Sequence, residues 1–158
     1  MSEIRYVQLE SPIGKLTLLA DEDSIVRLDM GPTRINDSWQ EGGATLKDAT
    51  RQLRAYFDGK LRDFELPLSP RGTEFQRRVW RQLCKIPFGQ AISYGQLASR
   101  CANPRASRAV GSANGRNPIG IIIPCHRVIA SDGKLGGYSA GLDRKRWLLR
   151  HEGVAVAD

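Results

Sequence analysis

Cys125 is the side chain in this sequence best suited to nucleophilic chemistry. It lies in the run Pro124-Cys125-His126-Arg127-Val128, beside a histidine and an arginine. A thiol attacks only as the thiolate, and a nearby imidazole or positive charge lowers the pKa at which the thiolate forms. Glu152 would complete a Cys–His–Glu relay if it oriented His126, as the acid does in hydrolase triads. Cys-His dipeptides also occur in purely structural positions, so the residues alone leave both interpretations open.

Metal and disulfide chemistry fit the cysteines and histidines poorly. A structural zinc site needs about four nitrogen or sulfur ligands at short paired spacings. The chain has no C-x-x-C pair, and its histidines are His126 and His151. Three cysteines (Cys84, Cys101 and Cys125) are an odd number, which predicts reduced thiols with separate roles. We therefore expect no metal and no cofactor, and we expect Cys84 to be a small core residue.

The distribution of charge predicts a polyanionic partner for the C-terminal half. The net charge is +7, but residues 1–70 hold 9 Lys/Arg and 12 Asp/Glu, whereas residues 71–158 hold 15 and 5. The halves therefore carry −3 and +10. Such asymmetry is typical of a nucleic-acid-binding segment joined to a mildly acidic support. A solvated basic surface that aids solubility is the alternative interpretation.

The composition is that of an ordinary soluble protein, with 41% hydrophobic and 26% charged residues. The longest clear apolar run, at residues 121–123, is far shorter than the roughly 20 residues that span a bilayer. The first residues also lack the pattern of a signal peptide. We therefore expect a cytoplasmic location.

Residues 1–70 are expected to form a small α/β support domain with a three-stranded sheet. Three segments alternate as strands do: residues 4–9, 15–20 and 25–30. A turn is expected at residues 11–14 and a loop at residues 32–43. Four residues then recur at helical spacing: Leu46, Ala49, Leu53 and Phe57. Residues 67–72 are the expected linker, and no chemistry is evident in this half.

Residues 73–158 are expected to form a mainly helical domain that carries the DNA-binding and active-site residues. Thr73 and Gln76 form a capping-box pattern, and Ser93 is placed to cap a helix over residues 94–100. Asn103-Pro104 predicts the start of a third helix. Two short helices joined by a tight turn, with a small-residue-rich second helix, indicate a helix-turn-helix. An ordinary helical hairpin with a solvated basic face is the alternative.

The third helix would present two different faces. Its apolar side would carry small residues: Ala106, Ala109 or Val110, and Ala113. Its polar side would carry Arg105, Arg108, Ser112 and Arg116. We further expect a buried strand at residues 119–123 that leads to Cys125, a glycine-rich loop at residues 133–141, and a last helix capped by Asp143.

Several blocks of the sequence resemble the O6-alkylguanine-DNA alkyltransferases, also called methylated-DNA–protein-cysteine methyltransferases. Pro124-Cys125-His126-Arg127-Val128, preceded by Asn117-Pro118 and a run of isoleucines, is similar to the active-site signature of that family. Four further blocks, two before and two after this run, also occur in the order found in the family: residues 92–98, 107–111, 137–139 and 147–153. The resemblance covers about residues 73–153, and the N-terminal half is similar to the variable domain of the family only loosely.

The resemblance implies roles for the residues around the thiol. Cys125 would accept the alkyl group, while His126, linked to it through a water and held by Glu152, would draw off the thiol proton. Tyr94 would crowd the target phosphate and donate a hydrogen bond to the guanine. Asn117 would brace the turn between the recognition helix and the active-site strand.

The resemblance also implies a guanine pocket and a DNA surface. The carbonyls of Cys125 and Val128 would receive the guanine amino group, the Ser139 amide would face the O6 atom, and Tyr138 would form pocket wall. Arg108 would enter the base stack where the damaged nucleotide leaves. The remaining expected DNA contacts come from the same helix and the turn before it: Arg105, Ala106, Ser107 and Ser112.

The implied fold is α+β, with a helical C-terminal domain that is winged-helix-like. The implied function is irreversible, single-turnover transfer of a methyl or other alkyl group from O6-alkylguanine, and from O4-alkylthymine, in DNA to Cys125. The partner would be double-stranded DNA, bound through the minor groove by a monomer. Gly120 stands where some relatives have a second proline, which leaves acceptance of bulky groups such as benzyl open.

Two other functions were weighed against this one. Alkyltransferase-like proteins bind the same lesions without an acceptor cysteine, and the presence of Cys125 argues against that role here. A cysteine hydrolase would use the same cysteine, histidine and glutamate, but it would explain neither the +10 half nor the helix-turn-helix.

Overall fold

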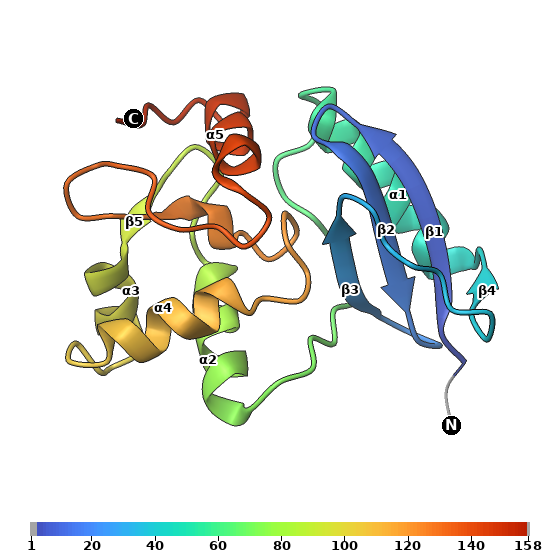
Figure 1. Ribbon diagram of the computed structural model, residues 1–158, viewed down its shortest axis with the longest axis horizontal. Coiled ribbons are helices and arrows are strands. Elements are labelled where there is room, and N and C mark those ends of the chain that lie inside the picture. The colour runs from blue at the N-terminus through green and yellow to red at the C-terminus, as the bar shows by residue number, and fades with distance from the viewer. Residues whose placement is uncertain (1–2, 158) are drawn as a thin grey trace. The chain divides into compact units, whose positions relative to one another are not determined.

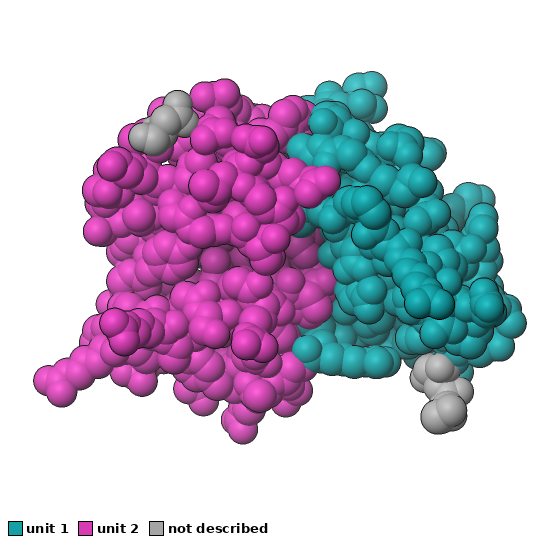
Figure 2. All heavy atoms as spheres, viewed as in Figure 1, with its two compact units in different colours: residues 1–71 teal, residues 72–158 magenta. Residues whose placement is uncertain are grey.

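The computed structural model describes residues 3–157, and the chain divides into two compact units between Arg71 and Gly72 (Figure 1 and Figure 2). The first unit is built on a sheet, and the second is mainly helical. The predicted α+β class is therefore confirmed. Among the described residues, no helix combines the length and the apolar character needed to cross a bilayer.

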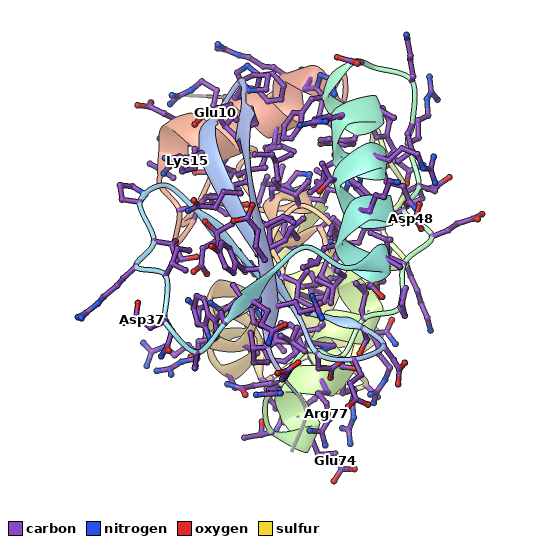
Figure 3. All side chains as sticks on the ribbon, turned by 90° about the vertical axis from the view of Figure 1, so that its right-hand side faces the viewer. Glu10, Lys15, Asp37, Asp48, Glu74 and Arg77 are labelled. Carbon is purple, nitrogen blue, oxygen red and sulfur yellow. The ribbon has the colours of Figure 1, made fainter. Side chains whose placement is uncertain are left out.

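The sheet of the first unit has four strands rather than the predicted three. They are β1 (Arg5–Ser11), β2 (Gly14–Ala20), β3 (Ile25–Met30) and β4 (Gln40–Glu41), in the order β3-β2-β1-β4. The first three confirm the predicted strands, and β1 and β2 form an antiparallel hairpin in which Glu10 pairs with Lys15 (Figure 3). β4 lies parallel to β1 inside the predicted loop. Two polar residues are too few to produce an alternating signal, so the sequence could not reveal this strand.

Helix α1 (Ala44–Phe57) packs against β1 and β2 on one face of the sheet (Figure 1). Leu46, Ala49 and Leu53 are buried, as their spacing predicted. Tyr56 is fully buried, whereas Phe57, the predicted fourth member of the face, is only half-buried. The apolar stripe therefore turns by one residue at the end of the helix.

The predicted linker is partly a structural element of the first unit. The backbone of Ile25 donates to the carbonyl of Pro67 at 2.8 Å, and the backbone of Ser69 donates to the carbonyl of Ile25 at 2.8 Å. The hydroxyl of Ser24 also donates to that of Ser69 at 2.7 Å. These bonds attach residues 67–69 to the edge of β3, so the chain leaves the sheet only after them.

The second unit contains four α-helices: α2 (Glu74–Leu83), α3 (Tyr94–Arg100), α4 (Ser107–Gly115) and α5 (Leu142–His151). Two short parallel strands, β5 (Ile92–Ser93) and β6 (Val128–Ile129), pair within it. Both predicted capping residues are confirmed, because Thr73 and Ser93 each form a complete capping box with a glutamine three residues on. α3 and α4 pack together, and both contact α2.

Trp80 fixes α2 to α4. Its side chain is 2% exposed, and its indole nitrogen Nε1 donates to the carbonyl of Ala113 at 2.8 Å. Val79 and Leu83 complete the buried side of α2. Cys84, however, is exposed at the C-cap of α2, so its assignment to the core was wrong. The helix ends at Leu83, and the next position no longer follows the buried face.

Two predicted helix starts were also wrong. α4 begins at Ser107, because Asn103 and Pro104 form only a single turn, closed by the backbone bond from Ala106 to the carbonyl of Asn103 at 3.0 Å. α5 begins after Gly141, whose φ of 98° ends the preceding loop, and Asp143 therefore lies in the first turn instead of at the cap. In both helices the cap position lacks a side-chain hydrogen bond.

The predicted strand at residues 119–123 is a buried turn. Ile123 donates to the carbonyl of Ile119 at 3.0 Å, and Ile122 donates to that of Gly120 at 2.8 Å. Ile121 has a φ of 70°, which is rare for a β-branched residue. The apolar run predicted burial correctly, but a run of five residues has no periodicity that distinguishes a strand from a turn.

Candidate active site

Cys125 opens a single 3₁₀ turn, η1 (Cys125–Arg127), between the buried turn and β6. Cys125 is buried, with 5% of its surface exposed. Burial raises the pKa of the Cys125 thiol, while the Asn117 side chain, the Lys145 ammonium and the Tyr138 hydroxyl act to lower it. A thiol placed in this way needs a base to become a nucleophile at neutral pH.

His126, the residue after Cys125, forms a buried pair with Glu152. Nε2 of His126 lies 2.8 Å from Oε2 of Glu152, and both side chains are fully shielded from solvent. Burial acts to raise the pKa of Glu152, but hydrogen bonds from His126 and Arg127 outweigh it and lower the pKa to about 2. An ionised carboxylate only accepts, so the hydrogen of neutral His126 lies on Nε2 and leaves Nδ1 as the basic nitrogen.

Arg127 is a second partner of Glu152 that the sequence analysis did not assign. Nε donates to Oε1 at 2.7 Å and Nη2 donates to Oε2 at 3.0 Å, while Nη1 donates to the carbonyl of Ile86 at 2.6 Å. Burial lowers the pKa of His126, Glu152 opposes that effect, and the Arg127 charge adds to it. Arg127 therefore fixes the carboxylate and helps keep the imidazole neutral before reaction. Its position directly after the Cys-His pair is the sequence signal that it could contact the acid of the relay.

Lys145 is the other residue that the sequence analysis missed. It is fully buried, and Nζ donates to the carbonyl of Val128 at 2.6 Å and to that of Gly137 at 2.9 Å. Burial lowers its pKa to about 8, and the charge of Cys125 opposes the shift. Arg144 and Arg146 flank it in the sequence, so the run of three cations does not show which of them is buried.

Tyr94 begins α3 and is half-buried beside the glycine-rich loop. Its hydroxyl lies 3.5 Å from the carbonyl of Gly137, and its ring lies 5.9 Å from Nζ of Lys145. A Cβ atom on Gly136, whose φ is 71°, would lie 3.0 Å from the Tyr94 ring. The loop therefore needs glycine here to pass so close to the tyrosine. Burial raises the pKa of the Tyr94 hydroxyl.

Asn117 connects both ends of the buried turn. Its Nδ2 donates to the carbonyl of Ile123 at 2.8 Å, and its Oδ1 accepts from the backbone of Ile119 at 3.0 Å. This clamp holds the strained segment that leads into Cys125. Of the proposed pocket residues on the other side, Val128 is buried, Tyr138 is half-buried, and Ser139 is exposed on the loop.

The two faces of α4 separate the DNA candidates from the thiol. Arg108 and Ser112 are exposed, as is Arg105 in the turn before the helix, while Ala106 and Ser107 are half-buried. On the opposite face Asn114 is buried and its Nδ2 lies 3.5 Å from the carbonyl of Cys125. One helix thus presents cations to solvent on one side and contacts the thiol's backbone on the other.

The fold and the site define an α+β protein with a buried thiol, followed by a buried histidine–glutamate pair, in a basic, mainly helical unit. A family described as "6-O-methylguanine DNA methyltransferase, DNA binding domain" matches residues 74–154, and its "ribonuclease-like domain" matches residues 4–70. The chain belongs to the 6-O-methylguanine DNA methyltransferase family.

Known relatives are similar over nearly the whole chain. The methylated-DNA–protein-cysteine methyltransferase of Methanosarcina acetivorans is 51% identical over 152 residues, which cover 94% of this chain and 97% of that protein. A crystal structure of Mycobacterium tuberculosis OGT in complex with DNA aligns with a TM-score of 0.86 and 46% identity, covering 95% of this chain and 92% of that one. A Methanococcus jannaschii O6-methylguanine DNA methyltransferase aligns with a TM-score of 0.67 and 28% identity, covering 97% and 95%.

Proposed function

We propose that this protein repairs DNA by moving the alkyl group of O6-alkylguanine irreversibly to Cys125. The observation that carries the proposal is the buried His126–Glu152 pair, joined at 2.8 Å, whose histidine directly follows Cys125 in the chain of a member of this family. Such a pair supplies the base that a buried thiol requires. The thioether product cannot be cleaved by a carboxylate, an imidazole or an amine at neutral pH, so each molecule reacts once.

The transfer has two chemical stages. First, the proton of the Cys125 thiol passes to Nδ1 of His126, and Glu152 stabilises the imidazolium that forms. The thiolate then attacks the alkyl carbon, a sulfur–carbon bond forms, and the bond from carbon to O6 breaks with its electron pair moving to the guanine. Tyr94 donates a hydrogen bond to the departing base, which takes up a proton from solvent to become guanine, while the imidazolium of His126 releases its proton to solvent.

Lys145 supports the same charge changes as a buried cation close to Cys125. Its ammonium lies near Cys125 without a carboxylate of its own in the hydrogen bonds described above, so a thiolate is its natural counter-ion. Nζ also donates a hydrogen bond to the carbonyl of Val128, which is one of the two proposed acceptors for the guanine amino group. A carbonyl has two lone pairs, so Lys145 and the guanine can both donate to it.

DNA is bound by the exposed face of α4. Arg108 enters the stack from the minor groove and replaces the rotated nucleotide, since the alkylated atom is out of reach inside a duplex. Arg105 and Ser112 contact the backbone, with Ala106 and Ser107 at the close approach of the helix to the duplex. The charge of +10 over residues 71–158 supports a phosphate-binding role, and one monomer suffices for one lesion.

Mass spectrometry after incubation with O6-methylguanine duplex tests the proposal. We expect a permanent gain of one methyl group on the peptide that contains Cys125, and no turnover in excess of protein. Cys125→Ala should lose transfer completely and still bind the modified duplex in a gel-shift assay. Binding without any mass gain in the unmodified protein would instead identify a lesion-binding protein, and multiple turnover on an ester would identify a hydrolase.

A further inference from the structure

Two buried polar atoms near the thiol have no hydrogen-bond partner among residues 3–157. They are Oδ1 of Asn114, on α4, and Nδ1 of His126, on η1. The two residues are 3% and 0% exposed. Buried polar atoms are nearly always paired, so two such atoms close to one reacting group require a physical explanation.

The two residues are both connected to Cys125, one through the Cys125 carbonyl and the other through the peptide bond. Nδ2 of Asn114 donates to the carbonyl of Cys125 at 3.5 Å, and His126 is the next residue along the same 3₁₀ turn. The amide cannot be turned over, because Oδ1 would then face the carbonyl of Cys125, and two acceptors would repel. Oδ1 is therefore held away from that carbonyl while its amide stays against the Cys125 backbone.

Both atoms are hydrogen-bond acceptors and cannot satisfy one another. Nδ1 of His126 accepts, because Nε2 carries the hydrogen that faces Glu152. Oδ1 of Asn114 is an amide oxygen, which only accepts. A single water molecule has the matching chemistry, since it donates two hydrogens and can still accept one from the thiol of Cys125.

We propose that Asn114 is a positioning residue, whose Oδ1 holds the water that relays the thiol proton from Cys125 to Nδ1 of His126. The inference deepens the proposed function and rests on it. In the relay the S–H bond breaks and its proton goes to the water oxygen, while one water O–H bond breaks and gives its proton to Nδ1. The result is a thiolate, a water and an imidazolium.

Asn114 is useful in both states of the relay. Before transfer, the water donates to Oδ1 and to Nδ1 and accepts from the thiol. Afterwards it accepts from the new N–H of His126 and donates to Oδ1 and to the thiolate. The Asn114 acceptor therefore fixes the water throughout, and its loss weakens the charged state most, because the thiolate and imidazolium then lose their oriented bridge.

The other charged and titratable groups around the thiol and imidazole are unchanged by substitution at Asn114. They come from the start of α3, from η1, from the glycine-rich loop and from α5 and its C-cap: Tyr94, Arg127, Tyr138, Lys145 and Glu152. A change in the pH dependence of Cys125 reactivity in an Asn114 variant therefore reports on the water held between Cys125 and His126.

The experiment measures the pH dependence of Cys125 alkylation by iodoacetamide, read from the Cys125 peptide by mass spectrometry. Asn114→Leu keeps the side-chain volume and removes the acceptor, and it should raise the midpoint by about one unit and slow alkylation about tenfold at pH 7. Asn114→Ser restores an acceptor and should recover most of the rate. The alkylation assay needs no DNA. The expected effect of Asn114→Leu can therefore fail to appear while the unmodified protein still transfers methyl groups, and methyl transfer can fail while the effect of Asn114→Leu is seen.

The matched control is Gln52→Leu, which removes a buried amide from α1 that bonds to the backbone of Glu65 at 3.0 and 2.9 Å. It should lower the melting temperature and leave the alkylation midpoint unchanged. An unchanged midpoint in folded Asn114→Leu, or a loss that Asn114→Ser does not recover, would overturn the proposal. If Asn114→Leu does not fold, nuclear Overhauser contacts between a long-lived water and His126 in the unmodified protein decide the matter: their presence supports the relay and their absence refutes it.

Discussion

The carboxylate of Glu152 has two buried partners, and its charge connects catalysis with stability. His126 and Arg127 both approach it, and together they hold the pKa of Glu152 at about 2. Because this folded-state pKa lies below the ordinary value of 4.5, the pair stabilises the fold above pH 4.5 and loses that contribution as the pH falls toward 2. The shift corresponds to roughly 3 kcal/mol.

Acid unfolding should therefore depend on Glu152. We expect the free energy of unfolding of the unmodified protein, measured with urea, to fall between pH 5 and pH 2.5 by an amount that is clearly smaller in Glu152→Gln. Asp143→Asn, which removes an exposed carboxylate that bonds to Arg146, is the control and should keep the full slope. Equal slopes in all three proteins would contradict the assignment of the low pKa.

Arg127 should be important for stability as well. Arg127→Met removes the arginine partner of the buried Glu152 carboxylate, which should cost about 3–5 kcal/mol in the free energy of unfolding. The double variant Arg127→Met/Glu152→Gln should recover part of that loss, because the buried charge that has lost its arginine is also removed. A cost below about 1 kcal/mol for the single variant would mean that solvent reaches the carboxylate.

At the scale of single residues, the sequence predicted the thiol and its base but not their full environment. Cys125, His126 and Glu152 could be named from a motif and a resemblance. Arg127 and Lys145 could not be assigned, because an arginine or lysine in a basic sequence is expected in solvent. Only the tertiary structure, which buries both side chains, distinguishes them from the exposed arginines of the second unit, such as Arg105 and Arg108.

At the scale of elements, the two faces of α4 separate the proposed DNA contact from the thiol that is proposed to react. Arg108 is on its exposed face, whereas the opposite face is buried near Cys125. An arginine that replaces a flipped nucleotide acts on the duplex and never touches the alkyl group. Tyr94, at the start of α3, is proposed to act on the guanine itself.

Arg108→Ala and Tyr94→Phe should therefore differ in which substrate they affect. Arg108→Ala should slow repair of alkylated duplex strongly and lose far less on free O6-alkylguanine, which needs no flipping. Tyr94→Phe removes the hydroxyl and should slow both reactions by similar factors. Single-turnover rate constants for the two variants on the two substrates provide the measurement. Equal losses on both substrates for Arg108→Ala would place that residue in the chemical step.

Element types were easier to predict than their ends and their irregular parts. Capping boxes at Thr73 and Ser93 are local signals, and both were correct. The predicted start of α4 and the predicted strand at residues 119–123 were wrong, because both segments form tight turns closed by their own backbone hydrogen bonds. Ile121 is the clearest case: its left-handed backbone contradicts local preference and is held by the Asn117 clamp.

At the scale of the whole molecule, charge is divided along the chain at nearly the same place as the fold. Residues 1–70 carry −3 and residues 71–158 carry +10, and the structural division falls between Arg71 and Gly72. The class of protein could be predicted from this asymmetry together with the sequence blocks that occur in family order within the second half. The four-stranded sheet of the first unit did not, since its shortest strand leaves no pattern in the sequence.

DNA affinity should consequently depend steeply on salt, and the dependence should trace to the second unit. Arg105→Ala should weaken binding to unmodified duplex and reduce the slope of log K against log salt by about 1. Arg51→Ala removes an exposed arginine from α1 and should change neither quantity. Fluorescence anisotropy over a salt series provides both values. A reduced slope for Arg51→Ala would extend the DNA surface to the first unit.

The hydrogen bond between Trp80 and Ala113 gives the molecule a built-in optical probe. The emission of a buried indole depends on its hydrogen bond and on the polarity around it, and this indole is attached to α4 one residue before Asn114. Any displacement of α4 that accompanies DNA binding or alkylation of Cys125 will change the light that Trp80 emits. With Trp39 and Trp147 replaced by phenylalanine, stopped-flow fluorescence would follow the state of this helix in real time, without an added dye.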